Sequence, residues 1–444
     1  MAQAARSKAA EVRDQPVALR LEAVVARLPA ADADLAAVYR ARAFRPLWMT
    51  GEGPRPEAQT VLALVRSAPE DGLIPARYAP EALAGRLAAA ESGDPSALAE
   101  AEVAVSRAYA RYAADLRTPI EMARLAWSDP ALRLDPPTPG QTLAAAAAAP
   151  SLAAHVAGLR RANPIYAHFR AALAEIRRNG GDADREQRLL ANLERARALP
   201  VDLGRRFIIV DAPAGRLWAF EEGGLVDTMA VVIGKPTAPT PEMAGLIRFA
   251  VYNPYWNIPV DLARYTYAPE ALRGGPAAID ALGIDVLSDW TPDPQVVAPE
   301  TVDWQAVRNG SIKARLRMRP GPFNLMGGVK LMLPNRLGIY LHDTPDRAAF
   351  ARDLRLVSNG CVRLEDAHRL AAWLLQGRRA GEGVEARVDL PEPVPVYITY
   401  FTLSPAPGGA VVERPDPYGR DGKLLAAIGQ TKTARSAPGR SAVS

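Results

Sequence analysis

Cysteine is almost absent from this chain, because its 444 residues contain one, Cys361. A single cysteine excludes a disulfide within the chain and any zinc site built from several thiolates. Histidine is also rare, with 4 residues, and His155 and His168 lack a second ligand at the i, i+4 spacing of helical metal sites. The sequence therefore predicts no bound metal and no cofactor.

Long apolar runs are missing as well. No run of about eighteen apolar residues occurs, so we expect no transmembrane helix. The residues from Met1 to Arg13 lack the apolar segment of a secretory signal, which leaves a cytoplasmic chain or one whose signal is not part of this sequence. Basic residues exceed acidic ones only slightly, 54 against 49, and form no basic stripe with interleaved aromatic residues. We therefore expect no nucleic-acid partner, and no pattern indicates an oligomeric state.

The first half of the chain has a helical pattern. Alanine and leucine dominate residues 15–200, and apolar residues recur three and four positions apart, as in Leu21, Val24, Val25 and Leu28. We predict a helical domain over residues 15–200, preceded by a flexible N-terminus at residues 1–14.

After Pro200 the pattern changes to short β-type runs. Residues 207–210, 217–220 and 229–233 are apolar runs separated by turns rich in Gly, Pro and Ala, which is typical of an antiparallel meander. Residues 261–317 interrupt this rhythm and indicate a lid or a small inserted subdomain. We expect the sheet to resume at residues 319–324.

The predicted fold class is therefore α+β. The helical domain precedes a mainly antiparallel β domain over residues 205–403, and residues 404–421 are expected to extend that β domain. The tail at residues 422–444 is basic and rich in Ser, Thr and Pro, so we expect it to be disordered.

His342 and Cys361 are the candidate catalytic pair. His342 ends an apolar, strand-like run, and Cys361 follows Ser358, Asn359 and Gly360, which are turn-forming residues that place it in a loop. A thiol needs a base or a positive electrostatic setting to act as a nucleophile at neutral pH, and His342 can supply the base. The alternative is a small buried Cys361 beside a hydrogen-bonded core histidine. The turn before Cys361 favours the catalytic interpretation.

This stretch resembles the catalytic signature of the L,D-transpeptidases, the enzymes that cross-link peptidoglycan. That signature is a His followed, after a spacer, by Ser-His-Gly-Cys-x-Arg, and here His342 and residues 358–363 fill those positions. Other segments resemble the long, multidomain periplasmic branch of the family, so that the resemblance covers most of residues 40–421. These segments are 46–48, 71–73, 192–195, 232–241, 253–259, 319–324, 333–335, 341–345 and 414–421.

The resemblance implies an acyltransferase that acts on peptidoglycan stem peptides in the periplasm or cell envelope, without a cofactor. Cys361 would be the nucleophile and His342 the base, with His342 steered by the main-chain carbonyl of Asp343. Carbapenems would acylate the thiol as covalent inhibitors. The oxyanion loop would consist of Ser358, Asn359 and Gly360, with the main-chain N–H groups of Gly360 and Cys361 as the donors.

The resemblance also implies a substrate groove capped by the insertion at residues 261–317. For the aromatic residues at 253–259, composition alone favours a packed loop corner over a groove wall. The expected substrate-contacting residues are Arg363, Tyr340, Asn324 and Trp256.

Two features differ from that branch. Asn359 stands where the family usually has His, and residues 177–194 leave no room for the peptidoglycan-binding helical module that the branch commonly carries. Besides cross-linking, the sequence leaves open an L,D-carboxypeptidase, an enzyme that anchors a protein, and a cell-wall-binding protein with an impaired active site. The retention of both His342 and Cys361 argues against the last.

Overall fold

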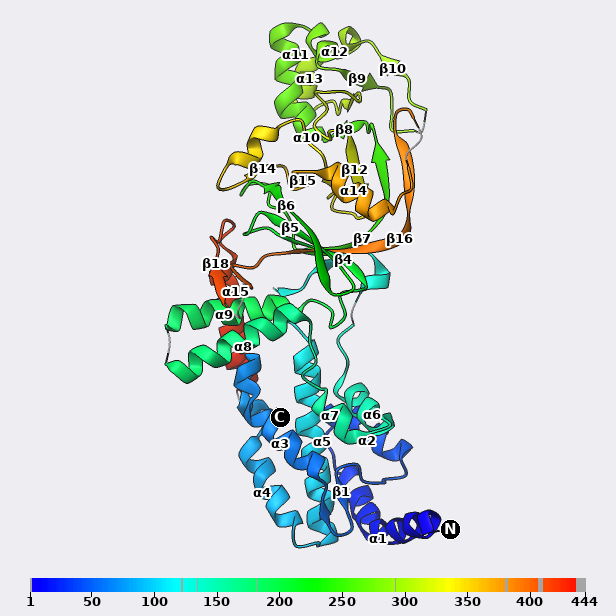
Figure 1. Cartoon of the computed structure of the whole chain (residues 1–444), viewed down its shortest axis with the longest axis vertical. Coiled ribbons are helices and arrows are strands. Elements are labelled where there is room, and N and C mark those ends of the chain that lie inside the picture. Colours follow the sequence, from blue (N-terminus) through cyan, green and yellow to red (C-terminus); the bar gives the residue numbers. More distant parts are fainter. Residues whose placement is uncertain are drawn as a thin grey trace. The chain divides into compact units, whose positions relative to one another are not determined.

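The computed structural model forms two compact units (Figure 1). The helical unit contains Met1–Leu125, Leu134–Asp202 and Phe401–Ser444, and the β unit contains Ala126–Arg133 and Leu203–Tyr400. The structure describes residues 2–120, 123–133, 135–180, 182–291, 293–379, 382–405 and 410–436. Within these ranges, no helix combines the length and apolarity that a membrane span requires.

The helical unit confirms the helical pattern of the first half of the sequence. Its helices are α1 (Ala2–Val25), α2 (Ala33–Ala41), α3 (Pro56–Arg66), α4 (Pro80–Ala90), α5 (Pro95–Arg117), α6 (Pro139–Ala148), α7 (Leu152–Ala157), α8 (Pro164–Asn179), α9 (Ala183–Arg197) and α15 (Arg420–Ser436), with short strands β1 (Met49–Thr50), β2 (Gly53–Pro54), β17 (Leu403–Pro405) and β18 (Val411–Glu413). Several helices open with Pro, whose missing N–H would have no partner in the first turn. The side chains of Asp94, Thr138 and Asn163 cap α5, α6 and α8.

A buried carboxylate holds the N-terminal part of this unit together. Glu102 of α5 is fully buried and accepts hydrogen bonds from the main-chain N–H groups of Leu47, Trp48 and Met49 at 2.7–3.0 Å. The hydroxyl of Tyr39 donates a fourth bond at 2.7 Å. Burial raises the pKa of Glu102, and these donors oppose that shift because they stabilise the carboxylate.

Both predictions about the ends of the chain are wrong. Residues from Ala2 onward belong to α1 rather than to a flexible segment, in keeping with the high helix propensity of alanine. The tail predicted to be disordered from residue 422 is helical as far as Ser436, while residues 437–444 lie outside the described residues. Leu424 of α15 is buried with Ala123 and Ala191, and this contact gives the helix a packing partner.

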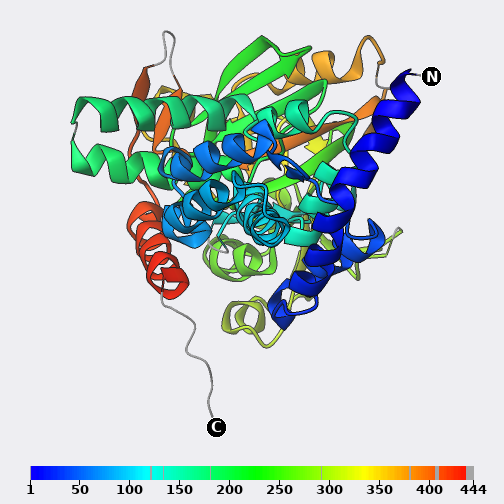
Figure 2. The same cartoon turned by 90° about the horizontal axis from the view of Figure 1, so that it is seen from below.

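Residues 401–436 belong to the helical unit, so the prediction that 404–421 extend the β domain is also wrong. Asn192 exchanges two hydrogen bonds of 2.9 Å with Thr402, and Arg195 pairs with Asp421 at 2.6 Å. Helices α8 and α9 lie side by side, and α15 packs against α9 (Figure 2). The helical end of the chain is thus fixed by polar contacts from α9.

The β unit confirms the mainly antiparallel sheet. Its main strands are β4 (Arg206–Asp211), β5 (Arg216–Glu221), β6 (Gly224–Gly234), β7 (Met243–Tyr252), β12 (Val329–Met332), β13 (Leu341–His342), β15 (Val362–Leu364) and β16 (Ala386–Thr399). They pair in the order β12-β13-β15-β6-β5-β4-β16-β7, and β7 pairs again with β12, so the sheet closes on itself. Two short strands, β3 (Ala126–Trp127) and β14 (Leu356–Ser358), add parallel pairs to β7 and β6. The segment Ala126–Arg133, which carries β3, was predicted to be part of the helical domain but belongs to the β unit.

The insertion forms a small subdomain with its own apolar core. It comprises β8 (Trp256–Ile258), α10 (Val260–Leu262), the π-helical stretch Ala263–Tyr267, α11 (Ala268–Gly274), α12 (Ala277–Ala281), β9 (Ile284–Leu287), β10 (Val296–Val297), α13 (Trp304–Asn309) and β11 (Arg315–Met318). Its strands pair in the order β10-β9-β11-β8. Residues 319–324, predicted as strand, form turns instead, because the strand ends at Met318 and Pro and Gly follow. Helix α14 (Ala367–Leu375) follows β15 and buries Leu370, Leu374 and Leu375.

We predict that Glu102→Ala lowers the free energy of unfolding of the helical unit by about 3 kcal/mol, since three buried N–H groups lose their acceptor. Glu102→Gln is expected to cost less, because the amide oxygen still accepts. Urea denaturation measures both. Glu100→Ala, on the same helix and partly exposed, is the matched control and should stay near wild type; equal stability of Glu102→Ala and the control would contradict the structural role of Glu102.

Candidate active site

Strand pairing places a basic residue on each side of His342. In β13, His342 lies opposite Lys330 of the antiparallel strand β12 and opposite Arg363 of the parallel strand β15. Side chains at opposite positions of paired strands project from the same face of a sheet. Leu341 projects from the other face and is fully buried. The register therefore sets the imidazole in a row between two cations.

The main chain fixes the orientation and tautomer of His342. Its Nδ1 lies 2.6 Å from the carbonyl oxygen of Asp343, as the resemblance predicted for this residue pair. Because a carbonyl oxygen only accepts, Nδ1 carries the proton and Nε2 keeps a free lone pair. The ring is thus arranged to accept a proton through Nε2.

The carboxylate of Asp343 secures the turn that supplies this carbonyl. It accepts a hydrogen bond of 2.8 Å from the N–H of Gly328 and pairs with Arg347 at 2.6 Å. Gly327 lies beside this carboxylate and has a φ of +62°. A Cβ on Gly327 would come within 2.3 Å of the Asp343 carboxylate. Glycine is therefore required at 327 by both conformation and space.

A hydroxyl bridge shapes the loop that carries Cys361. Ser358 Oγ donates to the carbonyl oxygen of Cys361 at 2.6 Å and accepts from the N–H of Gly360 at 3.1 Å. Thr240 Oγ1 donates to the carbonyl oxygen of Gly360 and accepts from the N–H of Gly234, both at 2.8 Å. Gly360 itself adopts a φ of +113°, which favours glycine. The hydroxyl of Thr240 therefore joins the end of β6 to the loop that carries Cys361.

These contacts decide which main-chain N–H groups of the loop are free to bind a substrate oxygen. The N–H of Gly360 already donates to Ser358, so in this conformation it is not available to a substrate oxygen. The N–H of Cys361 has no acceptor among the described residues. Asn359 is exposed at the edge of the groove, and its side chain has no hydrogen-bond partner in the described part of the chain.

Cys361 and His342 open into one groove of about 370 Å³. Its walls combine aromatic and aliphatic side chains with polar and charged groups in similar measure. The lining residues are Tyr255, Trp256, Asn257, Pro259, Leu262, Leu325, Met326, Lys330, Leu337, Gly338, Ile339, Tyr340, His342, Ser358, Asn359, Cys361 and Arg363. The predicted residues Arg363, Tyr340 and Trp256 are among them, so the aromatic segment at 253–259 does line a groove.

The prediction for Asn324 is wrong. Its side chain is 1% exposed, and its amide N–H groups donate to the carbonyl oxygens of Pro254 and Arg319 at 2.8 and 3.1 Å. Its carbonyl oxygen accepts from the N–H of Met326 at 2.8 Å. Asn324 therefore braces the loops behind the groove wall and does not face the groove.

Sequence reasoning did not single out Lys330 or the segment 337–339 as site residues. Lys330 sits in an apolar strand, where alternation predicts an outward side chain but not which loop it faces. Its position opposite His342 is visible only after the strands pair. The carbonyl oxygen of Gly338 lies 3.5 Å from the sulfur of Cys361.

Burial keeps both reactive groups uncharged at neutral pH. It raises the pKa of the Cys361 thiol, against a main-chain hydrogen bond from Tyr340 and the charge of Arg363. Burial also lowers the pKa of His342 to about 4, and the charges of Arg363 and Lys330 act in the same direction. The resting pair is therefore a thiol and a neutral imidazole, and not a preformed ion pair.

Comparison with known proteins agrees with this geometry. A model of the L,D-transpeptidase catalytic domain matches residues 205–398, and a model of a scaffold domain matches residues 33–173. This chain carries an L,D-transpeptidase catalytic domain. Apart from Ala126–Arg133, which belongs to the β unit, the scaffold match lies in the helical unit, and the catalytic match lies in the β unit.

A Haemophilus influenzae protein named "Putative L,D-transpeptidase" is 30% identical over 247 residues, which are 54% of this chain and 49% of that protein. This chain thus spans about half the length of that relative. Similar solved structures include an L,D-transpeptidase from Mycobacterium smegmatis and L,D-transpeptidase 3 from Mycobacterium tuberculosis, each 14% identical with a TM-score of 0.23. Each similarity covers 44% of this chain, and 58% and 61% of those chains. These scores are low, so the assignment rests on the two domain matches.

We predict that the alkylation rate of Cys361 by iodoacetamide rises with pH to a midpoint above about 8.5, the ordinary thiol pKa. Since the chain has 1 cysteine, the rate reports this site alone. Arg363→Gln should move the midpoint higher, because it removes a cation that favours the thiolate. Arg352→Gln, on the exposed loop before β14, is the control. A midpoint below pH 7 would instead reveal a thiolate–imidazolium pair.

Proposed function

We propose that this protein is a peptidoglycan L,D-transpeptidase that forms cross-links between stem peptides by way of a thioester on Cys361. The observation that carries the proposal is one groove that holds the thiol, an imidazole with a free Nε2, and two basic side chains in register with that imidazole. A nucleophile, an oriented base and anion-binding groups are the parts that acyl transfer from a carboxylate-bearing peptide requires.

In the first step, Cys361 attacks the carbonyl carbon of the third residue of a donor tetrapeptide. The thiol proton passes to Nε2 of His342, whose Nδ1–H stays on the carbonyl of Asp343. The imidazolium then protonates the leaving amine, and D-Ala departs as the thioester forms. General acid–base help of this kind contributes about 10²–10⁴ in rate.

Main-chain donors would hold the negative oxygen of the tetrahedral intermediate. The N–H of Cys361 is unengaged among the described residues, and the main chain of Tyr340 bonds to the Cys361 sulfur. When the substrate carbonyl carbon is bound to the Cys361 sulfur, the carbonyl oxygen lies near the N–H of Cys361 and the main chain of Tyr340. Fixed donors of this type stabilise the charge that develops in the transition state.

In the second step, the side-chain amine of a diamino acid on a neighbouring stem attacks the thioester. His342 takes the amine proton, an amide bond forms, and the proton returns to the sulfur as the C–S bond breaks. Water in place of the amine would make the protein an L,D-carboxypeptidase, and an amine on a protein would make it an anchoring enzyme. The aromatic and aliphatic side chains on the part of the wall that the insertion supplies, among them Trp256, Pro259 and Leu262, favour exclusion of water.

Lys330 and Arg363 would bind carboxylates of the donor stem. These carboxylates lie on either side of the scissile bond. Lys330 is 3.7 Å from Glu385 and Arg363 is 3.9 Å from Asp346, so within the described ranges both cations have only long contacts with acidic side chains. A closer carboxylate would gain a charge-assisted hydrogen bond at each position. Trp256, Pro259 and Leu262 of the inserted subdomain would cover the bound peptide.

A cell-wall-binding protein with an impaired site is the alternative of another class. Asn359 motivates it, but no described hydrogen bond of the site depends on that side chain. Both reactive residues and their supports are present, which favours the enzyme. Because peptidoglycan stems lie outside the inner membrane, we propose the periplasm or cell envelope as the site of action.

We predict that Cys361→Ala abolishes D-Ala release and dimer formation from purified disaccharide-tetrapeptides, measured by mass spectrometry. His342→Ala should lower the rate about 10²–10⁴-fold, since the base is lost. His168→Ala, in the helical unit, is the matched control. A carbapenem should add once to the wild type and not to Cys361→Ala. Equal inertness of the wild type and Cys361→Ala would leave the binding protein as the better account.

We predict that Lys330→Met raises KM for the donor about tenfold, the loss of one charge-assisted contact, with little change in kcat. Lys313→Met, exposed in the inserted subdomain, should change neither value. A donor whose carboxylates are amidated should bind the wild type and Lys330→Met alike. A tenfold difference that persists with the amidated donor would argue against carboxylate recognition by Lys330.

A further inference from the structure

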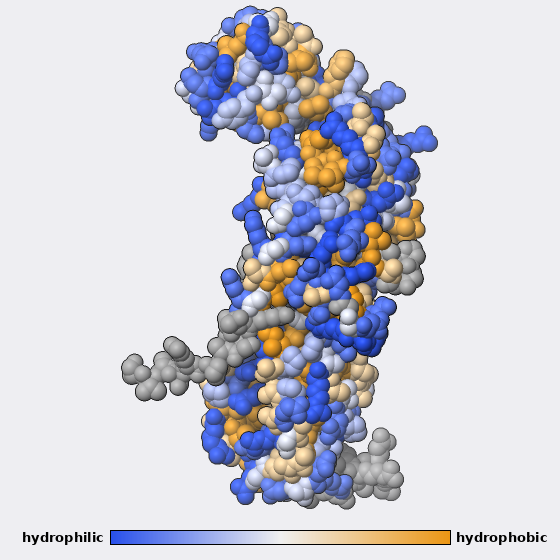
Figure 3. Space-filling model, turned by 90° about the vertical axis from the view of Figure 1, so that its left-hand side faces the viewer, coloured by the Kyte–Doolittle hydropathy of each residue, from blue (hydrophilic) through white to orange (hydrophobic). Residues whose placement is uncertain are grey.

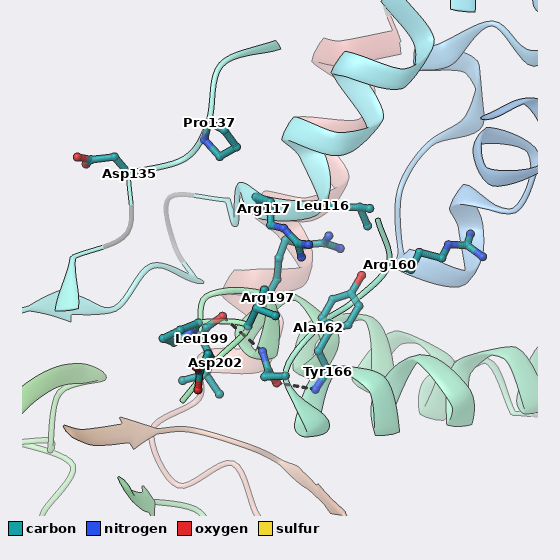
Figure 4. Close-up of a pocket in the computed structure, with 13 residues that line it drawn as sticks. Leu116, Arg117, Asp135, Pro137, Arg160, Ala162, Tyr166, Arg197, Leu199 and Asp202 are labelled. Atoms are coloured by element: carbon teal, nitrogen blue, oxygen red, sulfur yellow. Dashed lines mark hydrogen bonds between the residues drawn. The ribbon is translucent and has the colours of Figure 1, made fainter. Parts of the chain in front are cut away.

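The helical unit contains a cavity of about 420 Å³ far in the chain from the catalytic residues (Figure 4). It is bounded by the end of α5, the connection before α6, the start of α8 and the segment after α9. Its lining residues are Leu116, Arg117, Asp135, Pro137, Arg160, Ala162, Asn163, Tyr166, Arg197, Leu199, Pro200, Val201 and Asp202. All of them belong to the helical unit.

Asn163 makes one wall of this cavity rigid. Its Nδ2 donates to the carbonyl oxygens of Ala196 and Leu199 at 3.0 and 3.4 Å, and its Oδ1 accepts from the N–H of Tyr166 at 2.8 Å. The side chain is buried and joins α8 to the end of α9. The cavity is therefore a feature of packed elements rather than of a loose loop.

Two of the three arginines in the wall have acidic partners. Arg160 pairs with Asp71 at 2.9 Å, and Arg197 pairs with Glu194 at 3.0 Å. Arg197 also lies over the ring of Tyr166, 5.3 Å from its centroid. Their charges are balanced within the protein.

Arg117 differs from both. Its Nη2 donates to the carbonyl oxygen of Leu159 at 3.1 Å, and no carboxylate pairs with it among the described residues. Burial lowers its pKa, and the nearby charge of Arg197 acts in the same direction. A half-buried cation beside a second cation is costly unless an anion accompanies it. The geometry thus leaves guanidinium donors directed at the cavity without an acidic partner.

The rest of the wall selects the kind of anion. Leu116, Pro137, Ala162, Leu199 and Val201 give the cavity an apolar lining. Asp135 and Asp202 also border it, and their charges disfavour a multiply charged group such as phosphate. A planar carboxylate suits a single guanidinium, which can hold it through two parallel N–H bonds.

We propose that this cavity binds the carboxylate end of a short peptide with small apolar side chains. The carboxylate pairs with Arg117 and the methyl groups contact the apolar wall. Stem peptides that end in alanine have this chemistry, and their identification as the natural ligand rests on the proposed function. The scaffold domain would then hold a second stem while the catalytic domain acts.

The test is isothermal titration of N-acetyl-alanyl-alanine into the full chain carrying Cys361→Ala. Arg117→Met should weaken binding roughly ten- to hundredfold, the loss of a charge-assisted pair. Arg111→Met, on the same helix outside the cavity, removes the same charge and should leave the affinity unchanged. The C-terminal carboxamide of the probe should not bind at this site. Ala162→Leu, which fills the cavity and keeps every charge, should also abolish binding.

Several results would overturn the proposal. Equal affinity of Arg117→Met and the parent shows that the carboxylate does not bind here. Inorganic phosphate that competes as well as the peptide shows a general anion site instead. Two results together would show that Arg117 only braces Leu159. They are a large fall in the Tm of unliganded Arg117→Met and an unchanged affinity of Ala162→Leu for N-acetyl-alanyl-alanine. Turnover by the otherwise unmodified chain is measured in parallel, so a failure here is distinct from a failure of the proposed enzyme function.

Discussion

The candidate site depends on a strand two residues long. β13 lies between β12 and β15, and closure of the sheet requires Leu341 to enter the core. Because side chains alternate along a strand, His342 must then project from the opposite face, in line with Lys330 and Arg363. Both side chains are buried, so a shift by one residue would exchange them between the two faces and take the imidazole out of line with both cations. The packing of Leu341 in the hydrophobic core therefore fixes the position of His342.

The nucleophile loop depends on a second constraint, which is the close approach of the segment around Thr240. A Cβ on Gly234 would come within 2.1 Å of the carbonyl oxygen of Ala238, so the chain can turn there only at glycine. That turn brings the Thr240 hydroxyl to Gly360, and Ser358 completes the loop. Asn359 stands outside this set of bonds. The loop shape is thus compatible with residues other than histidine at position 359, while its glycines and hydroxyls are fixed. On the face shown in Figure 3, hydrophilic and hydrophobic residues are interspersed.

Sequence patterns predicted what depends on local chemistry. The helical half, the antiparallel meander, the inserted subdomain and the residues His342 and Cys361 follow from periodicity, turns and a motif. Long-range pairing was not predictable in the same way. Asn324 has the polarity of a groove residue, yet distant carbonyl groups bury it, and residues 401–436 join the helical unit because Asn192 and Arg195 bind them. Lys330 gained its significance only from the register.

The uncharged state of the resting pair has a chemical consequence. A permanent thiolate reacts with any oxidant that enters the groove, whereas the partly buried thiol of Cys361, whose pKa is raised, is largely protonated at neutral pH. Burial lowers the pKa of His342, and the charges of Arg363 and Lys330 lower it further. Carboxylates of a bound donor would offset those charges, so the basicity of His342 would rise when the thiol has a carbonyl to attack. In the proposed reaction, substrate binding and activation of the nucleophile are therefore parts of one electrostatic change.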